Sequence, residues 1–217
     1  ERAERRVANA MAGVSRGSAA WGDFDNDGRL DILIAGRGAE NPLMRIYRNE
    51  GGESFSDLGT FAFGVERGCA AAGDLDNDGD LDLAVAGLAA APAFALYRNE
   101  IAVTNHAPAA PGGLSALVES NRVTLGWNAA SDSETPSSSL TYNVRAGSAA
   151  GGTDVLSPAA QSNGWRKIVA GGNAGQRTGM VLTNVTPGTL RFTVQALDSA
   201  YAGSAFAAEQ TCVVPDQ

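Results

Sequence analysis

Histidine and cysteine are nearly missing from this chain of 217 residues, which has one histidine and two cysteines. His106 has no second histidine to work with, so a zinc hydrolase site and a His-based nucleophilic site have no candidate residues. A hydrolase built on two carboxylates stays formally open, but the prominent acids are grouped as metal ligands would be. We therefore predict that the protein is not an enzyme. Cys69 and Cys212 are either free thiols or form disulfides, within the chain or between chains, and the sequence does not decide because pairing depends on separation in space.

Basic stripes and long apolar runs are also lacking. Lysine and arginine together number 16 against 24 acidic residues, and no segment approaches the ~18 apolar residues of a membrane span. We expect neither a nucleic-acid partner nor a membrane span. The chain begins with a charged segment, 1–6, without an initiator methionine or a signal peptide, so we expect a mature chain, a processed product or a fragment. An apolar content of 44% and this length fit a globular protein of two domains.

What the chain does have is aspartate, concentrated in two nine-residue loops that lie 51 residues apart, 23–31 and 74–82. Each loop has aspartate at positions 1, 3, 5 and 9 and glycine at position 6, and 12 of the 19 residues of 18–36 recur in 69–87. These eight aspartates account for the whole formal net charge of −8. The acidity is therefore local, and two bound Ca²⁺ ions would bring the charge to about −4.

This spacing predicts two calcium sites. Ca²⁺ takes six to eight oxygen ligands, alternate residues of a tight loop converge on one centre, and a glycine at the reversal tolerates positive φ. The alternatives are Mg²⁺ and an Asp/Asn/Gly turn without metal, but four bare carboxylates would repel by roughly 4 kcal/mol per pair. The predicted ligands are Asp23, Asp25, Asp27, the backbone carbonyl of Arg29 and Asp31 in the first loop, and Asp74, Asp76, Asp78, the backbone carbonyl of Asp80 and Asp82 in the second.

The surroundings of the loops predict strands and not the helices of an EF-hand, which would also close with a glutamate at position 12. The apolar runs 30–35 and 81–86 are typical of buried strands. Four short strands per repeat of about 50 residues are typical of a propeller blade. The remaining segments expected as strands are 17–24, 43–48 and 54–58 in the first repeat, and 68–75 and 93–98 in the second.

The stretches 22–31 and 73–82 and the sequence Tyr-Arg-Asn-Glu, at 47–50 and again at 97–100, resemble the FG-GAP/VCBS repeat family. These repeats are calcium-binding blades that also occur in integrin alpha-chain propellers. The resemblance covers roughly 13–104, and it implies two four-stranded blades with the metal loop between the first and second strands. We assign the blades to residues 1–104. Two blades are too few to close a propeller of four to eight, so we expect other chains, or a longer chain, to complete the structure.

The second half of the chain differs in composition. A Pro/Ala linker at 105–111 precedes a region, 112–217, in which apolar residues alternate with polar ones, as in an antiparallel β-sandwich. The stretches 123–127, 140–145, 185–188 and 194–198 resemble a fibronectin type III domain over about 107–214. The sequence departs from that family at Leu190, where a tyrosine is usual. A Gly/Ser/Ala-rich segment at 147–173 predicts an extended loop between strands.

We therefore expect an all-β protein with two four-stranded propeller-type blades and a C-terminal fibronectin III-like sandwich. The predicted function is a calcium-stabilised extracellular structural or adhesion protein, secreted or on the cell surface, which assembles into an oligomer or filament. Its partners would be other copies of itself or an extracellular protein or glycan. The alternative is a carbohydrate-binding module, or the C-terminal fragment of a larger secreted propeller protein that acts on polysaccharide. Tyr47 and Tyr97, which recur at equivalent positions, would then contact sugar instead of packing within the blades.

Overall fold

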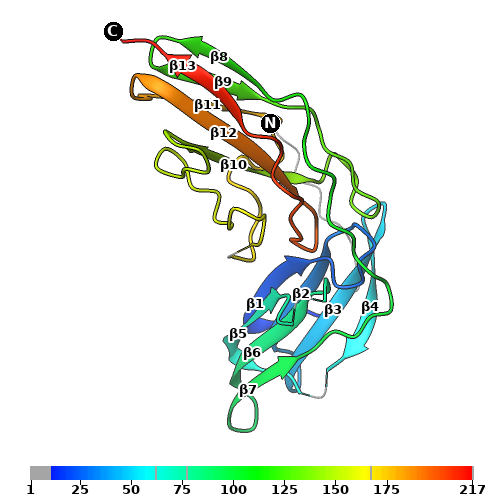
Figure 1. The fold of residues 1–217 in the computed structure, drawn as a ribbon. Helices are drawn as coiled ribbons and strands as arrows, with labels where there is room; N and C mark the ends of the chain where they lie inside the picture. Colours follow the sequence, from blue (N-terminus) through cyan, green and yellow to red (C-terminus); the bar gives the residue numbers. More distant parts are fainter. Residues whose placement is uncertain (1–10, 62, 77, 167, 217) are drawn as a thin grey trace, which may run out of the picture. The chain divides into compact units, whose positions relative to one another are not determined.

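The computed structural model describes residues 11–61, 63–76, 78–166 and 168–216, which form thirteen strands and no helix (Figure 1). Since no helix occurs in these residues, none of them offers a helical membrane span. The chain divides into two compact units, 1–105 and 106–217. The expected all-β class is confirmed.

The first sheet is the four-stranded antiparallel blade that the sequence predicts. Its strands follow one another in chain order, each paired with the next. The β3–β4 hairpin turns at Gly52 and Glu53, whose φ angles of +58° and +68° are those of a type I′ turn. The strands are β1 (Ser15–Gly22), β2 (Asp31–Arg37), β3 (Pro42–Gly51) and β4 (Ser54–Thr60).

The second sheet has three strands among the residues that the structure describes, one fewer than expected. They are β5 (Glu66–Gly73), β6 (Asp82–Leu88) and β7 (Pro92–Tyr97). The physical reason lies in the turn: the counterparts of Gly52 and Glu53 are Ala102 and Val103. A β-branched residue such as Val103 is strongly disfavoured at positive φ, so the hairpin that begins the fourth strand of the first sheet has no equivalent here.

The two sheets of this unit pack face to face, with β5 beside β1 and β2 (Figure 1). The backbone N–H of Ala70 in β5 donates a hydrogen bond to Ser18 Oγ in β1, at 3.1 Å. A Cβ at Gly22 would lie 2.9 Å from Leu81 Cδ1, so the glycine permits close approach of the second acidic loop's end. The buried side chains include Leu33 and Met44 from the first sheet and Val85 from the second.

The second unit is a β-sandwich, as predicted, with the sheet orders β11-β9-β8 and β10-β12-β13. Its core includes Trp127 and Tyr142, whose ring centroids lie 5.7 Å apart. Leu190, at the position where the fibronectin III family usually has a tyrosine, is also buried in this core. The strands are β8 (Ser115–Glu119), β9 (Arg122–Gly126), β10 (Thr141–Gly147), β11 (Gly179–Leu182), β12 (Gly188–Leu197) and β13 (Gln210–Val214). A long connection without a named strand joins β10 to β11.

The segment expected as a linker is tied to the sandwich. Pro108 and Pro111 are buried, and the N–H of Ala109 donates to the Ser131 carbonyl at 2.8 Å. His106 Nδ1 lies 2.8 Å from Glu134 Oε1. His106 is therefore an exposed residue with an acidic partner in the sandwich.

Candidate metal centres

The first acidic loop, 23–31, is held by hydrogen bonds from its own backbone to its first aspartate. Asp23 is buried, and its two carboxylate oxygens accept the N–H groups of Asp27, at 3.0 Å, and Gly28, at 2.9 Å. Gly28 has a φ of +84°, so the chain reverses at the glycine where the sequence predicts it, and Asn26 also has a positive φ, of +55°. The hydrogen bonds within the loop therefore fix its shape without an ion.

The last aspartate of this loop joins the loop to the sheet. Asp31 is fully buried, and its carboxylate accepts the N–H groups of Phe24, at 3.0 Å, and of Asn49 at the end of β3, at 2.8 Å. Burial raises the pKa of Asp31 to about 6, against the lowering effect of these two hydrogen bonds. The role that the structure shows for Asp31 is therefore to satisfy backbone donors.

The second acidic loop, 74–82, repeats this arrangement. Asp82 accepts the N–H groups of Leu75, at 2.7 Å, and Asn99, at 2.8 Å, as Asp31 does with Phe24 and Asn49. Asp74 accepts the N–H of Gly79 at 3.3 Å, and Gly79 has a φ of +98°. The repeat in sequence is therefore a repeat in hydrogen bonding.

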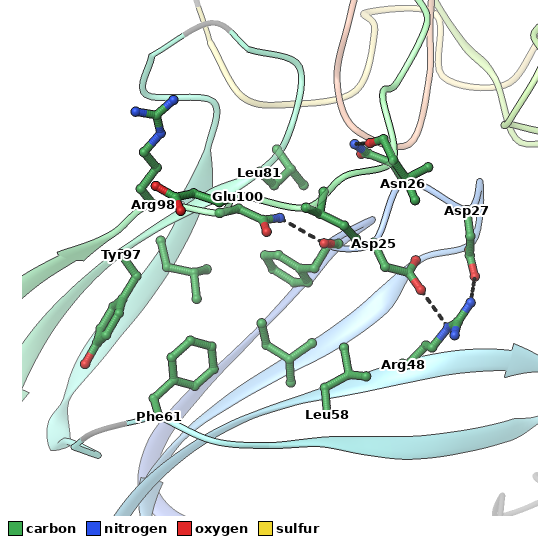
Figure 2. Close-up of a pocket in the computed structure, with 16 residues that line it drawn as sticks. Asp25, Asn26, Asp27, Arg48, Leu58, Phe61, Leu81, Tyr97, Arg98 and Glu100 are labelled. Carbon is green, nitrogen blue, oxygen red and sulfur yellow. Dashed lines mark hydrogen bonds and ion pairs between the residues drawn. The ribbon is translucent and has the colours of Figure 1, made fainter.

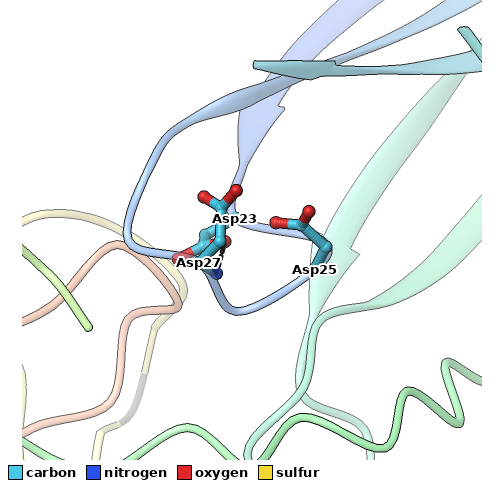
Figure 3. Close-up of side chains that lie close together, drawn as sticks. All are labelled: Asp23, Asp25 and Asp27. Atoms are coloured by element: carbon cyan, nitrogen blue, oxygen red, sulfur yellow. Dashed lines mark hydrogen bonds between the residues drawn. The ribbon is translucent and has the colours of Figure 1, made fainter. Parts of the chain in front are cut away.

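In each loop, three carboxylates converge. One oxygen from each of Asp23, Asp25 and Asp27 lies within 4.8 Å of the others (Figure 3). Asp74, Asp76 and Asp78 form the same kind of cluster in the second loop. The carbonyls of Arg29 and Asp80, and the side chains of Asp31 and Asp82, are not part of these side-chain clusters. Their assignment as ligands remains a prediction.

The first cluster fits a cation in two further respects. Asp25 Oδ1 is buried and has no hydrogen-bond partner, which leaves one oxygen free to coordinate an ion. Burial raises the pKa of Asp25, and the charge of Asp27 raises it further, so the ionised cluster has a cost that a cation would offset. Oxygen-only ligands of this kind suit Ca²⁺ or Mg²⁺.

An arginine from the end of the third strand serves each cluster. Arg48 Nε lies 2.6 Å from Asp25 Oδ2 and its Nη2 3.2 Å from Asp27 Oδ2 (Figure 2). Arg98 makes the same two ion pairs, to Asp76 at 2.6 Å and to Asp78 at 3.2 Å. Sequence reasoning missed this role, although the repetition of Tyr-Arg-Asn-Glu at an almost constant distance from the loops was the available signal.

The two loops differ in charge at position 7. Arg29 donates from Nε to the Asn49 carbonyl at 2.6 Å and forms an ion pair with Asp27. Its counterpart in the second loop is Asp80. Burial and the neighbouring Asp78 carboxyl together raise the pKa of Asp80 to about 6. The hydrogen bond from Asp80 lowers the pKa of Asp78 to about 2. Two arginines therefore offset charge in the first loop and one does so in the second.

A largely apolar pocket of about 790 Å³ lies beside the first cluster, between the two sheets (Figure 2). Ile46, Leu58 and Leu83 line it, and Tyr97 contacts Phe61 edge-on at a centroid distance of 5.2 Å. Tyr47 is 3% exposed and its hydroxyl accepts the N–H of Ala12 at 2.8 Å. Tyr47 is therefore a packing residue, and the sugar-contact alternative finds no exposed ring there.

Comparison with known proteins gives one family. Residues 13–85 match the FG-GAP-like repeat, and this single match includes both acidic loops. No match was found among curated proteins.

Two solved structures resemble the chain at low identity. The spore cortex lytic enzyme SleM of Clostridium perfringens has a TM-score of 0.31 and 16% identity over 66% of this chain. The chain covers 36% of that enzyme. The chicken CNTN1 FN1–FN3 domains have a TM-score of 0.41 and 12% identity over 96% of this chain and 69% of theirs.

Proposed function

We propose that this protein is a non-enzymatic, calcium-stabilised structural or adhesion protein of the extracellular space. The observation that carries the proposal is the pair of convergent carboxylate clusters, each built on the same hydrogen-bonded loop. Backbone N–H groups of each loop bind its own aspartates and fix its shape, and one oxygen from each of three aspartates still converges on a common centre. Two such loops, at equivalent places in two sheets, would each hold the ends of neighbouring strands together when an ion is bound.

Calcium is the ion that this geometry favours. The clusters lie in short loops and offer carboxylate oxygens only, and Ca²⁺ accepts variable geometry with six to eight oxygens. Mg²⁺ demands a near-ideal octahedron and keeps several waters. Extracellular modules work with calcium affinities of about 10⁻⁴–10⁻³ M, which suits a partly exposed loop such as 74–82. FG-GAP-like repeats typically occur in extracellular proteins. Together with the calcium affinity expected for such loops, this supports a secreted or cell-surface location.

A structural role also accounts for the rest of the chain. The sandwich has a continuous apolar core and needs no ion, whereas the first unit depends on loops rich in like charge. Adhesion or assembly, with other copies of this chain or with an extracellular protein or glycan as partner, uses exposed surfaces and needs no catalytic group. Calcium would then determine whether the first unit is rigid enough to present such a surface.

The test is calorimetric unfolding of the full chain with calcium and with chelator. A ligand that binds only the folded state adds about 2.7 kcal/mol at a hundredfold excess over its Kd. We expect calcium to raise the melting temperature of the unit 1–105 and to leave that of the unit 106–217 unchanged. The double variant D23N/D74N should lose the shift, and D216N, an exposed aspartate of the sandwich, should retain it. Identical melting with and without calcium would contradict the proposal.

A further inference from the structure

Equivalent faces of the two sheets in the first unit have different surroundings. In the first sheet, Ala35 pairs with Met44 and Leu33 with Ile46, so these four side chains share one face. In the second sheet, the same register joins Ala86 to Phe94 and Ala84 to Leu96. We call the first set the covered face and the second set, with Cys69 and Ala71 of β5, the open face.

The contrast in exposure is large. Met44 is 1% exposed and Ile46 8%, whereas their counterparts Phe94 and Leu96 are 68% and 53% exposed. A hollow of about 200 Å³ beside Leu96 and Ala71 adds to the open face. An exposed row of apolar side chains on a sheet marks an interaction surface. The open face is apolar like a protein core, but in the described part of the chain no second sheet covers it.

The structure also shows what kind of surface covers such a face. The covered face of the first sheet lies under the opposite face of the second sheet, which contributes Leu83 and Val85. The counterparts of these residues in the first sheet are Ile32 and Ile34, which are half-buried. They share their face with Trp21, which is 56% exposed. We call these three residues the tryptophan face.

Among the residues that the structure describes, each chain therefore carries both halves of one interface, left exposed on two different sheets. A surface that fits a different surface on an identical molecule makes a head-to-tail, heterologous contact. The first sheet bears the covered face, and the second sheet, which comes later in the chain, covers it. After β7, however, the chain continues into the sandwich, which begins a different core.

We propose that the open face of one copy of this chain binds the tryptophan face of a second copy, and so repeats the internal contact between the two sheets. The proposal rests on the structural role proposed above, but it involves no metal ligand. Propellers close with four to eight blades. With two sheets from each copy, closed rings of two, three or four copies meet that requirement.

The experiment measures the mass of the full chain in calcium by sedimentation, from about 1 µM to about 1 mM, a range that spans weak to moderate contacts. The wild type should associate to a defined mass of two, three or four copies. F94S and W21S should each remain monomeric at concentrations where the wild type associates. The matched control L117S, which replaces an exposed leucine on β8 of the sandwich, should associate like the wild type. Circular dichroism would confirm that each variant is folded.

Mixing the two monomeric variants gives the sharpest result. F94S retains an intact tryptophan face and W21S an intact open face, so an equimolar mixture should form a one-to-one complex. A wild type that stays monomeric throughout would overturn the proposal. Association that F94S abolishes and W21S leaves intact would also overturn it, because the open face would then bind itself or another surface. The calcium melting experiment reports on the structural role independently of either outcome.

Discussion

The two acidic loops have nearly the same sequence and nearly the same hydrogen bonds, yet the carboxylate cluster of the first is more buried than that of the second. Asp23 is inaccessible to solvent, and its counterpart Asp74 is exposed. The segment after β7 lies over the first loop: Asn26 Nδ2 donates to the Val103 carbonyl and Asn99 Nδ2 to the Phe24 carbonyl, both at 2.9 Å. The burial of a loop is therefore a property of the repeat that follows it and not of the loop itself.

The largest contrast between the loops should appear when their last aspartates are removed. D31A leaves the N–H groups of Phe24 and Asn49 without acceptors in a buried place, at about 1–3 kcal/mol each, so we expect a loss of about 2–5 kcal/mol. D82A should cost less, about 1–2 kcal/mol, because Leu75 is exposed and its N–H can reach water. Denaturant unfolding in chelator measures both.

A second substitution at Asp31 tests whether this residue is a calcium ligand. D31N keeps one acceptor for the backbone and removes the charge. If Asp31 serves the backbone alone, D31N should leave calcium affinity within about twofold, well under the tenfold that corresponds to 1.4 kcal/mol. A loss of calcium binding in a folded D31N protein would establish the ligand role instead.

Exchanging the residues at position 7 should bring the calcium affinities of the loops toward each other. R29D removes a cation that pairs with Asp27 and adds an anion, so we expect the first loop to bind calcium about tenfold more tightly. D80R should weaken the second loop by a similar factor. Titration calorimetry on each variant, with the other loop disabled by D74N or D23N, measures one site at a time. Shifts in the opposite directions would show that Arg29 and Asp80 act through loop shape.

A smaller effect is expected from the arginines at the strand ends. Arg48 and Arg98 offset carboxylate repulsion when no ion is present, so R48Q and R98Q should lower the melting temperature more in chelator than in calcium. The effect of R48Q should exceed that of R98Q, since Arg48 is the less exposed of the two. Thermal unfolding in both buffers measures this. Equal losses with and without calcium would show that the arginines serve packing alone.

The smallest expected effect concerns the two free thiols. Cys69 is exposed on the open face, where its counterpart Ser18 contacts the other sheet. Burial raises the pKa of Cys212, which lowers its thiolate fraction near neutral pH. Alkylation followed by mass spectrometry should therefore modify Cys69 before Cys212, and C69S should abolish the fast phase. Comparable rates at both positions would contradict this assignment.

Much of the fold could be predicted from local patterns. Apolar runs placed the strands of the first unit that the structure shows and, in the second unit, those near 123–127, 140–145 and 194–198. Gly28 and Gly79 marked the loop reversals, because these features depend on neighbours in the chain. The fourth strand of the second sheet was wrongly expected by analogy with the first. The absence of glycine at Ile101 and Ala102 was a local signal against it, since the matching turn in the first sheet uses positive φ.

The candidate site could be predicted only in part. The spacing of Asp23, Asp25 and Asp27 indicated convergence, which the structure confirms. That Asp31 meets the backbone of Asn49, and that Arg48 meets Asp25, depends on the packing of β3 beside the loop. No spacing rule along the chain predicts which carboxylate a residue some twenty positions away will contact, although the repeated Tyr-Arg-Asn-Glu sequence marked both residues as paired with something repeated.

By itself, the sequence determined that this protein has two equivalent acidic loops, strands of blade type around them and a separate sandwich, because turn chemistry and apolar periodicity act over a few residues. Only the tertiary structure decided which loop is buried, which aspartates serve the backbone, and that Phe94 and Leu96 lie exposed where Met44 and Ile46 are covered. The reason is physical. Burial is determined by which surfaces meet, and one repeat here has a successor to cover it while the other does not.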